Sequence, residues 1–273
     1  MKREFAILGI VIGIIGGFLI GWLVPPLFVP APEARVSLLD QIISRDYILV
    51  GTSPDYPPFE NKTYPGGQIV GFDIDVSQMI ADQIGVTLQM VEMDFDSLIG
   101  GCVAGTIDMI AAAMTYTPQR AEELAASSTY FTVSQVVMVR NDSTMFPVPI
   151  ADLTDLADST VGVQSGTVMQ EEIDAIATAN NITVVAFPRV DLLVAELVAD
   201  TIDAAYVDGP IFDAWAATED LRKIFSTGLE PLALWTRLGE PELLYEINDV
   251  ILSSYLDGSM YDLINLWFGN VTT

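Results

Sequence analysis

An uncharged apolar run stands near the start of the chain, and shorter periodic segments of apolar and polar residues follow it. The run extends from Phe5 to Val24, after Lys2 and Arg3 and before two prolines. A helix of about 20 residues rises about 30 Å, which is enough to cross a bilayer. Because basic residues favour the cytoplasmic side, the pattern predicts an uncleaved transmembrane helix over residues 1–24, which anchors the rest of the chain on the extracytoplasmic face. The alternative is secretion after cleavage of a signal peptide, whose apolar region is usually ~7 to 15 residues.

Three features accompany this run. Residues 25–36 are rich in Pro and Ala and predict a tether between membrane and domain. Glycines recur every four residues along one face of the run and indicate either self-association or the general frequency of glycine in membrane helices. These glycines are Gly9, Gly13, Gly17 and Gly21. Sequons for N-glycosylation, which support export, begin at Asn61, Asn141, Asn181 and Asn270.

Beyond the tether, the periodicity predicts alternating helices and strands. A short helix over residues 37–45 precedes a strand over residues 48–51. Prolines punctuate the next segment, T-S-P-D-Y-P-P-F-E, so no helix can form there, and Tyr56 and Phe59 are expected on a loop at the carboxyl end of the strand. An amphipathic helix then begins at about Asp73 and ends at Gly85.

An internal repeat decides the predicted architecture. Residues 96–108 align with residues 191–203 at an offset of 95, and both copies contain T-I-D. Each copy has the pattern strand, turn, helix, strand, which is typical of a parallel sheet with helices on both faces. Ligands of such sheets bind at the carboxyl ends of the strands, where the offset places Asp208 opposite Ala113. A bare backbone at one strand end and a carboxylate at the other would suit a zwitterion.

The two copies predict an α/β protein of two lobes. Lobe 1 is predicted over residues 37–133 plus 230–273, and lobe 2, residues 134–229, is inserted within it. The chain then crosses between the lobes twice, at residues 130–134 and 229–233. Two crossings form a hinge that allows the lobes to close around a ligand.

Arg120 is the candidate anchor for an anionic group. Thr117 is a good N-cap and Pro118 fits the first helical position, so Arg120 falls in the first turn of a helix. The helix dipole disfavours a cation there by ~0.3 to 1 kcal/mol, and a negative group must compensate. That group is either a surface carboxylate, Glu122 or Glu123, or an anionic ligand.

A second anion-binding element is predicted in the loop Q-S-G-T. This loop precedes a helix that begins near Val168, and the free N–H groups of Gly166 and Thr167 could bind the same anion.

Composition excludes several functions. The chain has 11 basic and 37 acidic residues and a net charge of −26, which repels nucleic acid. It has no histidine, so neither a catalytic His nor a His-based metal site exists, and no cofactor or metal is predicted. The single cysteine, Cys102, lies among apolar residues and is expected to be a buried thiol.

Several motifs together resemble one known family. They are G-T-S-P-D-Y-P-P-F-E, G-F-D-I-D-V, M-D-F-D, A-A-M-T-Y-T-P-Q-R, V-Q-S-G-T, Y-V-D-G-P and G-S-M-Y-D-L-I-N-L-W-F-G. Over residues 38–270 the chain is similar to the family-three extracellular solute-binding components of ABC importers, of the polar amino-acid-binding type. The resemblance implies the type II periplasmic-binding-protein fold, closure of two lobes around a free amino acid, and delivery of that amino acid to a membrane permease.

The resemblance also implies roles for individual residues. Arg120 would bind the α-carboxylate through both arms of its guanidinium, with help from the backbone of Thr115 and Thr167. Asp208, the Ala113 carbonyl and the Thr115 hydroxyl would hold the α-ammonium. The remaining residues would surround the side chain of the ligand: Tyr56 and Phe95 beside it, Gln164 and Ser53 at its far end.

The ligand and the function have alternatives. Many relatives carry Asp in place of Ser53, which helps to hold a cationic side chain, so we expect a polar, uncharged amino acid, although Asp55 could restore a cation site. A dehydratase of the cyclohexadienyl or arogenate type has the same fold and would need a general acid, for which Glu60 and Asp208 are the available carboxylates. In that comparison Asp208 is better suited to an ammonium, and Glu60 is expected to cap the loop. A sensor ectodomain would have to signal through a partner.

Overall fold

The structure is a computed structural model that describes residues 35–64, 66–146 and 148–269. The described residues from Ser37 onwards form one compact unit. The predicted anchor over residues 1–24 and most of the tether lie outside the described residues. Within the described ranges, no helix is both long and apolar enough to cross a membrane.

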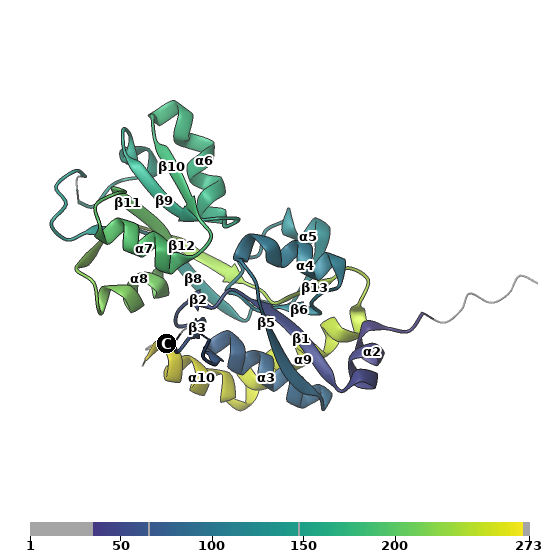
Figure 1. The fold of residues 1–273 in the computed structure, drawn as a ribbon. Coiled ribbons are helices and arrows are strands. Elements are labelled where there is room, and N and C mark those ends of the chain that lie inside the picture. Colours follow the sequence, from purple (N-terminus) through teal and green to yellow (C-terminus); the bar gives the residue numbers. More distant parts are fainter. Residues whose placement is uncertain (1–34, 65, 147, 270–273) are drawn as a thin grey trace, which may run out of the picture. The chain divides into compact units, whose positions relative to one another are not determined.

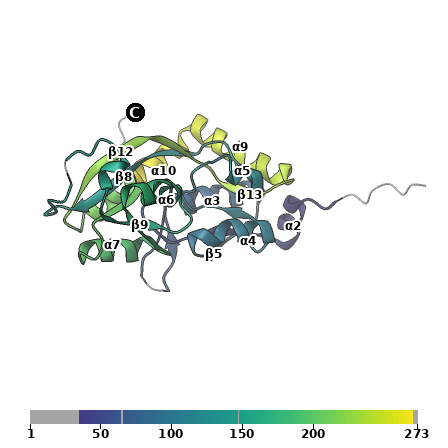
Figure 2. The ribbon, with the colours of Figure 1, turned by 90° about the horizontal axis from the view of Figure 1, so that it is seen from above.

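The first sheet has the strand order β5-β1-β6-β13-β7. Strand β1 runs parallel to β5 and β6, and β13 is antiparallel to β6 and β7. The strands are β1 (Tyr47–Thr52), β5 (Thr87–Glu92), β6 (Met109–Ile110), β7 (Leu124–Ala126) and β13 (Trp235–Arg237). The helices packed on one face are α2 (Leu38–Arg45), α3 (Phe72–Ile84), α9 (Pro241–Asp257) and α10 (Ser259–Phe268). On the other face lie the 3-10 turn η1 (Phe95–Ser97) and α4 (Leu98–Ala104), which Figure 2 shows well apart from α9.

The second sheet has the order β10-β9-β11-β8-β12. Its strands are β8 (Phe131–Arg140), β9 (Thr160–Gln164), β10 (Thr183–Phe187), β11 (Ala204–Asp208) and β12 (Leu221–Leu232). Helix α6 (Val168–Asn180) covers one face, and α7 (Val190–Val198) and α8 (Gly209–Ala216) cover the other (Figure 1). The short elements that remain are η2 (Leu153–Leu156) and α5 (Arg120–Glu123).

The internal repeat corresponds to matching hydrogen bonds in the two sheets. The Asp108 carboxylate accepts from the Leu49 amide at 2.7 Å, and the Asp203 carboxylate accepts from the Thr160 amide at 2.7 Å. Each aspartate follows the helix of its repeat and ties the loop to the neighbouring parallel strand. The repeat therefore predicted correctly the parallel strands β5-β1-β6 and β10-β9-β11 and their helices, whereas β13 and β8 run antiparallel to these strands.

Strands β8 and β12 link the two sheets. They form a long antiparallel pair from Phe131 opposite Leu232 to Arg140 opposite Leu221. At the end near the first sheet, Thr115 forms a bridge with Leu232, and the Ala233 amide donates to the Met114 carbonyl at 3.1 Å. The predicted crossings at residues 130–134 and 229–233 thus fall on one hydrogen-bonded ribbon, which continues into the ligand-facing segment before Arg120.

The segment after β1 is more ordered than its prolines suggest. We expected a loop, but it forms a small antiparallel sheet of β2 (Asp55–Tyr56), β3 (Glu60–Lys62) and β4 (Ile69–Val70). Phe59 anchors this sheet, because its ring lies 5.0 Å from Phe268 and 5.6 Å from Phe131, centroid to centroid. Gly71 has φ +150°, and a Cβ there would lie 2.0 Å from the Phe59 carbonyl oxygen, so only glycine fits.

Candidate ligand-binding site

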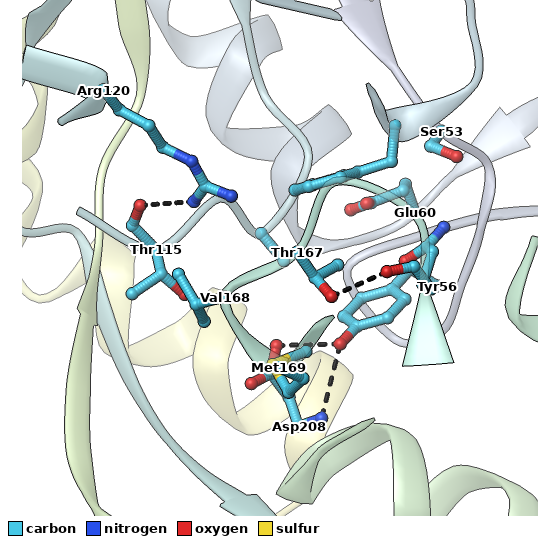
Figure 3. A pocket seen from close by; sticks show the side chains of 12 residues that line it. Ser53, Tyr56, Glu60, Thr115, Arg120, Thr167, Val168, Met169 and Asp208 are labelled. Atoms are coloured by element: carbon cyan, nitrogen blue, oxygen red, sulfur yellow. Dashed lines mark hydrogen bonds between the residues drawn. The ribbon is translucent and has the colours of Figure 1, made fainter. Parts of the chain in front are cut away.

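Every residue that the sequence predicted for the site borders one small cavity of ≈ 10 Å³. These residues are Ser53, Tyr56, Phe95, Ala113, Thr115, Arg120, Gln164, Thr167 and Asp208. Three further residues complete the lining: Glu60, Val168 and Met169. Figure 3 shows Arg120 and Thr115 at one side of the cavity and Ser53 and Glu60 at the other. The cavity therefore has a basic end and an acidic end.

Arg120 is buried at the basic end. Its guanidinium donates two hydrogen bonds to backbone carbonyls. Nη1 donates to the Thr115 oxygen at 2.7 Å, and Nη2 donates to the Gly166 oxygen at 3.0 Å. The residue is 7% exposed, and burial lowers the pKa of its guanidinium to about 10. Its Cζ atom lies 5.7 Å from the centre of the Phe95 ring, within range of a cation–π interaction.

The local sequence explains this position of Arg120. The Thr117 hydroxyl accepts from the Arg120 amide at 3.1 Å, as expected of a capping threonine. The ion pairs among the described residues do not include Arg120 with Glu122 or Glu123, so the surface-pair interpretation was wrong. Guanidinium hydrogens that are not used by the two carbonyls remain for a ligand.

The Q-S-G-T loop is arranged differently from the prediction. The Gly166 amide donates to Gln170 Oε1 at 2.9 Å, so it is not free for an anion. Thr167 is the N-cap of α6: its hydroxyl donates to the Gln164 carbonyl at 2.7 Å and accepts from the Gln170 amide at 3.3 Å. The loop therefore contributes to the site the Gly166 carbonyl, which accepts from Arg120, and Thr167, which borders the cavity.

Asp208 lies between the two ends of the cavity, at the end of β11. It is the N-cap of α8, but its side chain makes no capping bond, and Oδ2 instead accepts from the Tyr56 hydroxyl at 2.9 Å. Its other oxygen, Oδ1, is buried and has no hydrogen-bond partner within the described residues. Burial raises the pKa of Asp208 to about 7, although the Tyr56 hydroxyl and the Arg120 charge lower it.

Glu60 is the residue that the sequence interpretation placed wrongly. It does not cap the loop: it is fully buried in β3, borders the cavity, and neither carboxylate oxygen has a hydrogen-bond partner in the described part of the chain. Burial raises the pKa of its carboxyl well above the usual value, and the charges of Asp73, Asp55 and Asp208 raise it further. A buried carboxyl without a partner is costly, so this acid requires an explanation.

Asp73 does not border the cavity, but it binds the backbone of Ala113, which does. Its Oδ2 accepts from the Ala113 amide at 2.8 Å, and both oxygens accept from the Tyr130 hydroxyl at 2.8 Å. Ala113 has φ +45°, a left-handed conformation that costs a non-glycine residue roughly 1 kcal/mol or more. Asp73 thereby fixes the Ala113 backbone at the cavity and joins α3 to the start of the β8 ribbon. The sequence interpretation took Asp73 for a helix-start residue, which is true of its backbone but not of its carboxylate.

Ser53 and Gln164 lie at the acidic end and share one partner, Asp55. The Ser53 hydroxyl donates to Asp55 Oδ1 at 2.6 Å, and Gln164 Nε2 donates to Asp55 Oδ2 at 3.3 Å. Asp55 itself does not border the cavity. It is therefore placed to orient the side chains that do.

Comparison with known proteins decides the family. Residues 48–270 match the model of the bacterial extracellular solute-binding proteins, family 3. The chain belongs to this family. The solute-binding protein is 31% identical over 173 residues to the arginine-binding extracellular protein ArtP of Bacillus subtilis, a match that covers 63% of the chain and 65% of ArtP. The match thus spans somewhat less than two thirds of that relative's length.

Solved structures resemble the solute-binding protein over more of its length. A mutant of ArgBP from T. maritima aligns with a TM-score of 0.79 and 36% identity, over 85% of this chain and 99% of that one. The ancestral amino acid-binding protein AncCDT-1, described as a precursor of cyclohexadienyl dehydratase, aligns with a TM-score of 0.78 and 31% identity, over 85% and 100% of the two chains. These likenesses confirm the two-lobed periplasmic-binding-protein fold.

Acidic and cysteine side chains are the groups of this solute-binding protein that metal or thiol chemistry would use. No group of three or more acidic or cysteine side chains there is placed to hold a metal ion. Cys102 is buried, and burial raises the pKa of its thiol to about 12.

Proposed function

We propose that the chain is the extracytoplasmic binding component of an ABC importer, which captures a free amino acid by closing its lobes and delivers it to a membrane permease. The proposal rests on one observation: Arg120 and Asp208 border the same cavity. A guanidinium with spare donors and a carboxylate with one unpartnered oxygen match the two charges of an amino-acid zwitterion.

The lining supports one orientation of the ligand. The α-carboxylate binds the Arg120 guanidinium together with the backbone of Thr115 and Thr167. The α-ammonium binds Asp208 Oδ1, the Ala113 carbonyl and the Thr115 hydroxyl. The ligand's side chain then extends between Tyr56 and Phe95 towards Ser53, Gln164 and Glu60, at the acidic end of the cavity.

Glu60 changes the expected ligand class. The uncharged side chain that we expected rested on Ser53, but Glu60 adds an unpartnered carboxyl at the same end. If Glu60 and Asp208 are both ionised, Arg120 neutralises only one of them, and a zwitterion brings no further net charge. A cationic side chain completes the balance, so we propose an amino acid of the arginine or lysine type. ArtP and ArgBP, whose names refer to arginine, agree with this class.

A dehydratase remains the rival function because of one specific observation. A buried Glu60 with a raised pKa is a carboxyl of the kind that serves as a general acid. AncCDT-1, however, is described as an amino acid-binding protein. Recovery of the ligand unchanged after incubation distinguishes binding from turnover.

Membrane anchoring is a separate part of the proposal. The apolar run over residues 5–24 would hold the binding unit near the permease, and the tether of residues 25–36 would raise its local concentration there. Cells that carry either the anchored chain or residues 37–273 alone test this point. We expect uptake to fall sharply without the anchor while ligand affinity stays the same.

A thermal-shift screen of residues 37–273 against the amino acids tests the main proposal. Ligands that bind only the folded state raise the melting temperature. We expect arginine or lysine to produce a large shift and acidic amino acids to produce none. A protein that responds to no amino acid, or that converts its ligand, contradicts the proposal.

A further inference from the structure

Asp55 contacts the cavity lining from both sheets while lying outside the cavity. It accepts from Ser53, which follows β1, and from Gln164, which ends β9; its Oδ2 also accepts from the Val190 amide at the start of α7. Asp55 is 3% exposed, and three donors meet its two oxygens. Burial raises the pKa of Asp55, whereas the Ser53 hydroxyl, the Val190 amide and the Arg189 charge lower it. All three groups donate to Asp55, and only the Ser53 hydroxyl among them could instead accept from a carboxyl proton, so the donated bonds favour the ionised form.

This arrangement decides which atoms of Ser53 and Gln164 remain for a ligand. A hydroxyl and an amide can each donate or accept a hydrogen bond. The single Ser53 hydroxyl hydrogen is used on Asp55. Gln164 Nε2 lies near two acceptors, Asp55 Oδ2 and the Pro188 carbonyl at 3.5 Å. Neither acceptor can donate, so the amide nitrogen must face them, and Gln164 Oε1 is left for the cavity.

We propose that Asp55 sets the hydrogen-bond polarity of the cavity's acidic end, by taking the donors of Ser53 and Gln164 so that both present acceptors to a donor-rich side chain. Together with Glu60, these acceptors suit a guanidinium, which only donates. Asp55 is thus a positioning residue for specificity. This inference rests on the proposed function, since it concerns the same site.

Arginine and citrulline form the matched pair of probes. They have the same length, but the ureido group of citrulline carries a carbonyl acceptor where arginine has a donor. In Asp55→Asn, the amide oxygen can still accept from Val190 and Gln164, so the amide nitrogen must face Ser53. The Ser53 hydroxyl hydrogen then turns towards the cavity. By calorimetry, we expect the preference for arginine over citrulline to fall about tenfold or more.

Two control variants distinguish the effect on hydrogen-bond polarity from two other effects. One is a change in nearby charge, and the other is loss of the hydrogen bond by which Asp55 holds α7 against the segment after β1. Asp191→Asn removes a nearby charge that is not bonded to Asp55, and the preference should stay unchanged. Val190→Pro removes the amide that Asp55 accepts from and replaces the buried Val190 side chain with another apolar one. Proline is tolerated at this first helical position because Arg189 before it is extended, with φ −138° and ψ 144°. This variant should weaken both ligands equally.

The outcomes are distinct. Two outcomes would overturn the proposal: equal losses for both ligands in Asp55→Asn, or a changed preference in Val190→Pro. Either would show that Asp55 acts only by holding α7 against the segment after β1. If Asp55→Asn does not fold, Ser53→Ala replaces it: loss of one acceptor should lower the preference severalfold, and an unchanged preference again overturns the proposal. A wild-type chain that binds neither these probes nor any other amino acid instead refutes the proposed function on which the inference rests.

Discussion

The hydroxyl of Tyr56 donates to Asp208 Oδ2 at 2.9 Å and accepts from the Asp208 amide at 3.3 Å, so one phenol fixes both the side chain and the backbone at the end of β11. Tyr56 comes from the small sheet after β1, and Asp208 from the second sheet. Because Tyr56 occupies Oδ2, the oxygen left for a ligand is Oδ1. The geometry therefore presents one carboxylate oxygen rather than two.

The role of Asp208 can be tested through the ligand's amino group. Asp208→Asn keeps the shape but removes the charge, so we expect a loss of arginine affinity of roughly tenfold or more. Binding of 5-guanidinopentanoate, which lacks the amino group, should change little. Calorimetry with both ligands decides, and Asp213→Asn, an exposed acid on the same helix α8, is the control. Equal losses for the two ligands would show that Asp208 does not contact the ammonium.

Arg120 should be required for the carboxylate. Arg120→Ala removes charge-assisted hydrogen bonds, and we expect affinity to fall at least ~100-fold with the melting temperature of the free chain little changed. Arg120→Lys keeps the charge but loses the planar fork, so it should recover only part of the binding. Titration calorimetry measures both variants. An unchanged dissociation constant in Arg120→Ala would remove Arg120 from the site.

Parts of this site could be predicted because their residues stand in motifs at strand ends. Arg120 follows a capping Thr and Pro, and the repeat places Asp208 at a strand's carboxyl end. Glu60 and Asp55 could not be placed in this way. The prolines around them predict a loop, whereas both residues lie buried in the short strands β2 and β3. Whether a buried acid finds a partner depends on contacts between distant segments, as with Asp73 and Tyr130, which are 57 residues apart. The lobe boundaries at residues 133/134 and 229/230 stay a prediction.

We expect Glu60 to lower the stability of the free chain and to raise its affinity for arginine. Glu60→Gln removes an unpartnered buried carboxyl, so the melting temperature of the free chain should rise at neutral pH. The same change should lower arginine affinity by about tenfold or more while leaving glutamine affinity nearly the same. Melting curves and calorimetry test both halves of this prediction. Glu242→Gln, which alters an exposed acid of α9, is the matched control. A fall in both stability and glutamine affinity would indicate a structural role instead.

Binding and stability should depend on pH with opposite signs. The pKa of Asp208 is raised to about 7 by burial in the unliganded cavity, as is the pKa of Asp73 behind it. In the unfolded chain both acids titrate near their ordinary value of about 4. Between about pH 4 and 7 the folded state therefore holds more protons than the unfolded state, and the stability of the free chain should fall as pH rises.

Ligand binding reverses this trend, because an ammonium beside Asp208 and a guanidinium beside Glu60 both favour the ionised acids. Arginine binding should release protons, and its affinity should rise from about pH 5 to 7, by at most ~10-fold per pH unit for each proton released. Glutamine should release about one proton fewer than arginine, because it lacks the charge that would ionise Glu60. Calorimetry in buffers of different ionisation enthalpy counts these protons, and Asp208→Asn should remove one of them for either ligand. Equal proton release by arginine and glutamine would separate Glu60 from the recognition of side-chain charge.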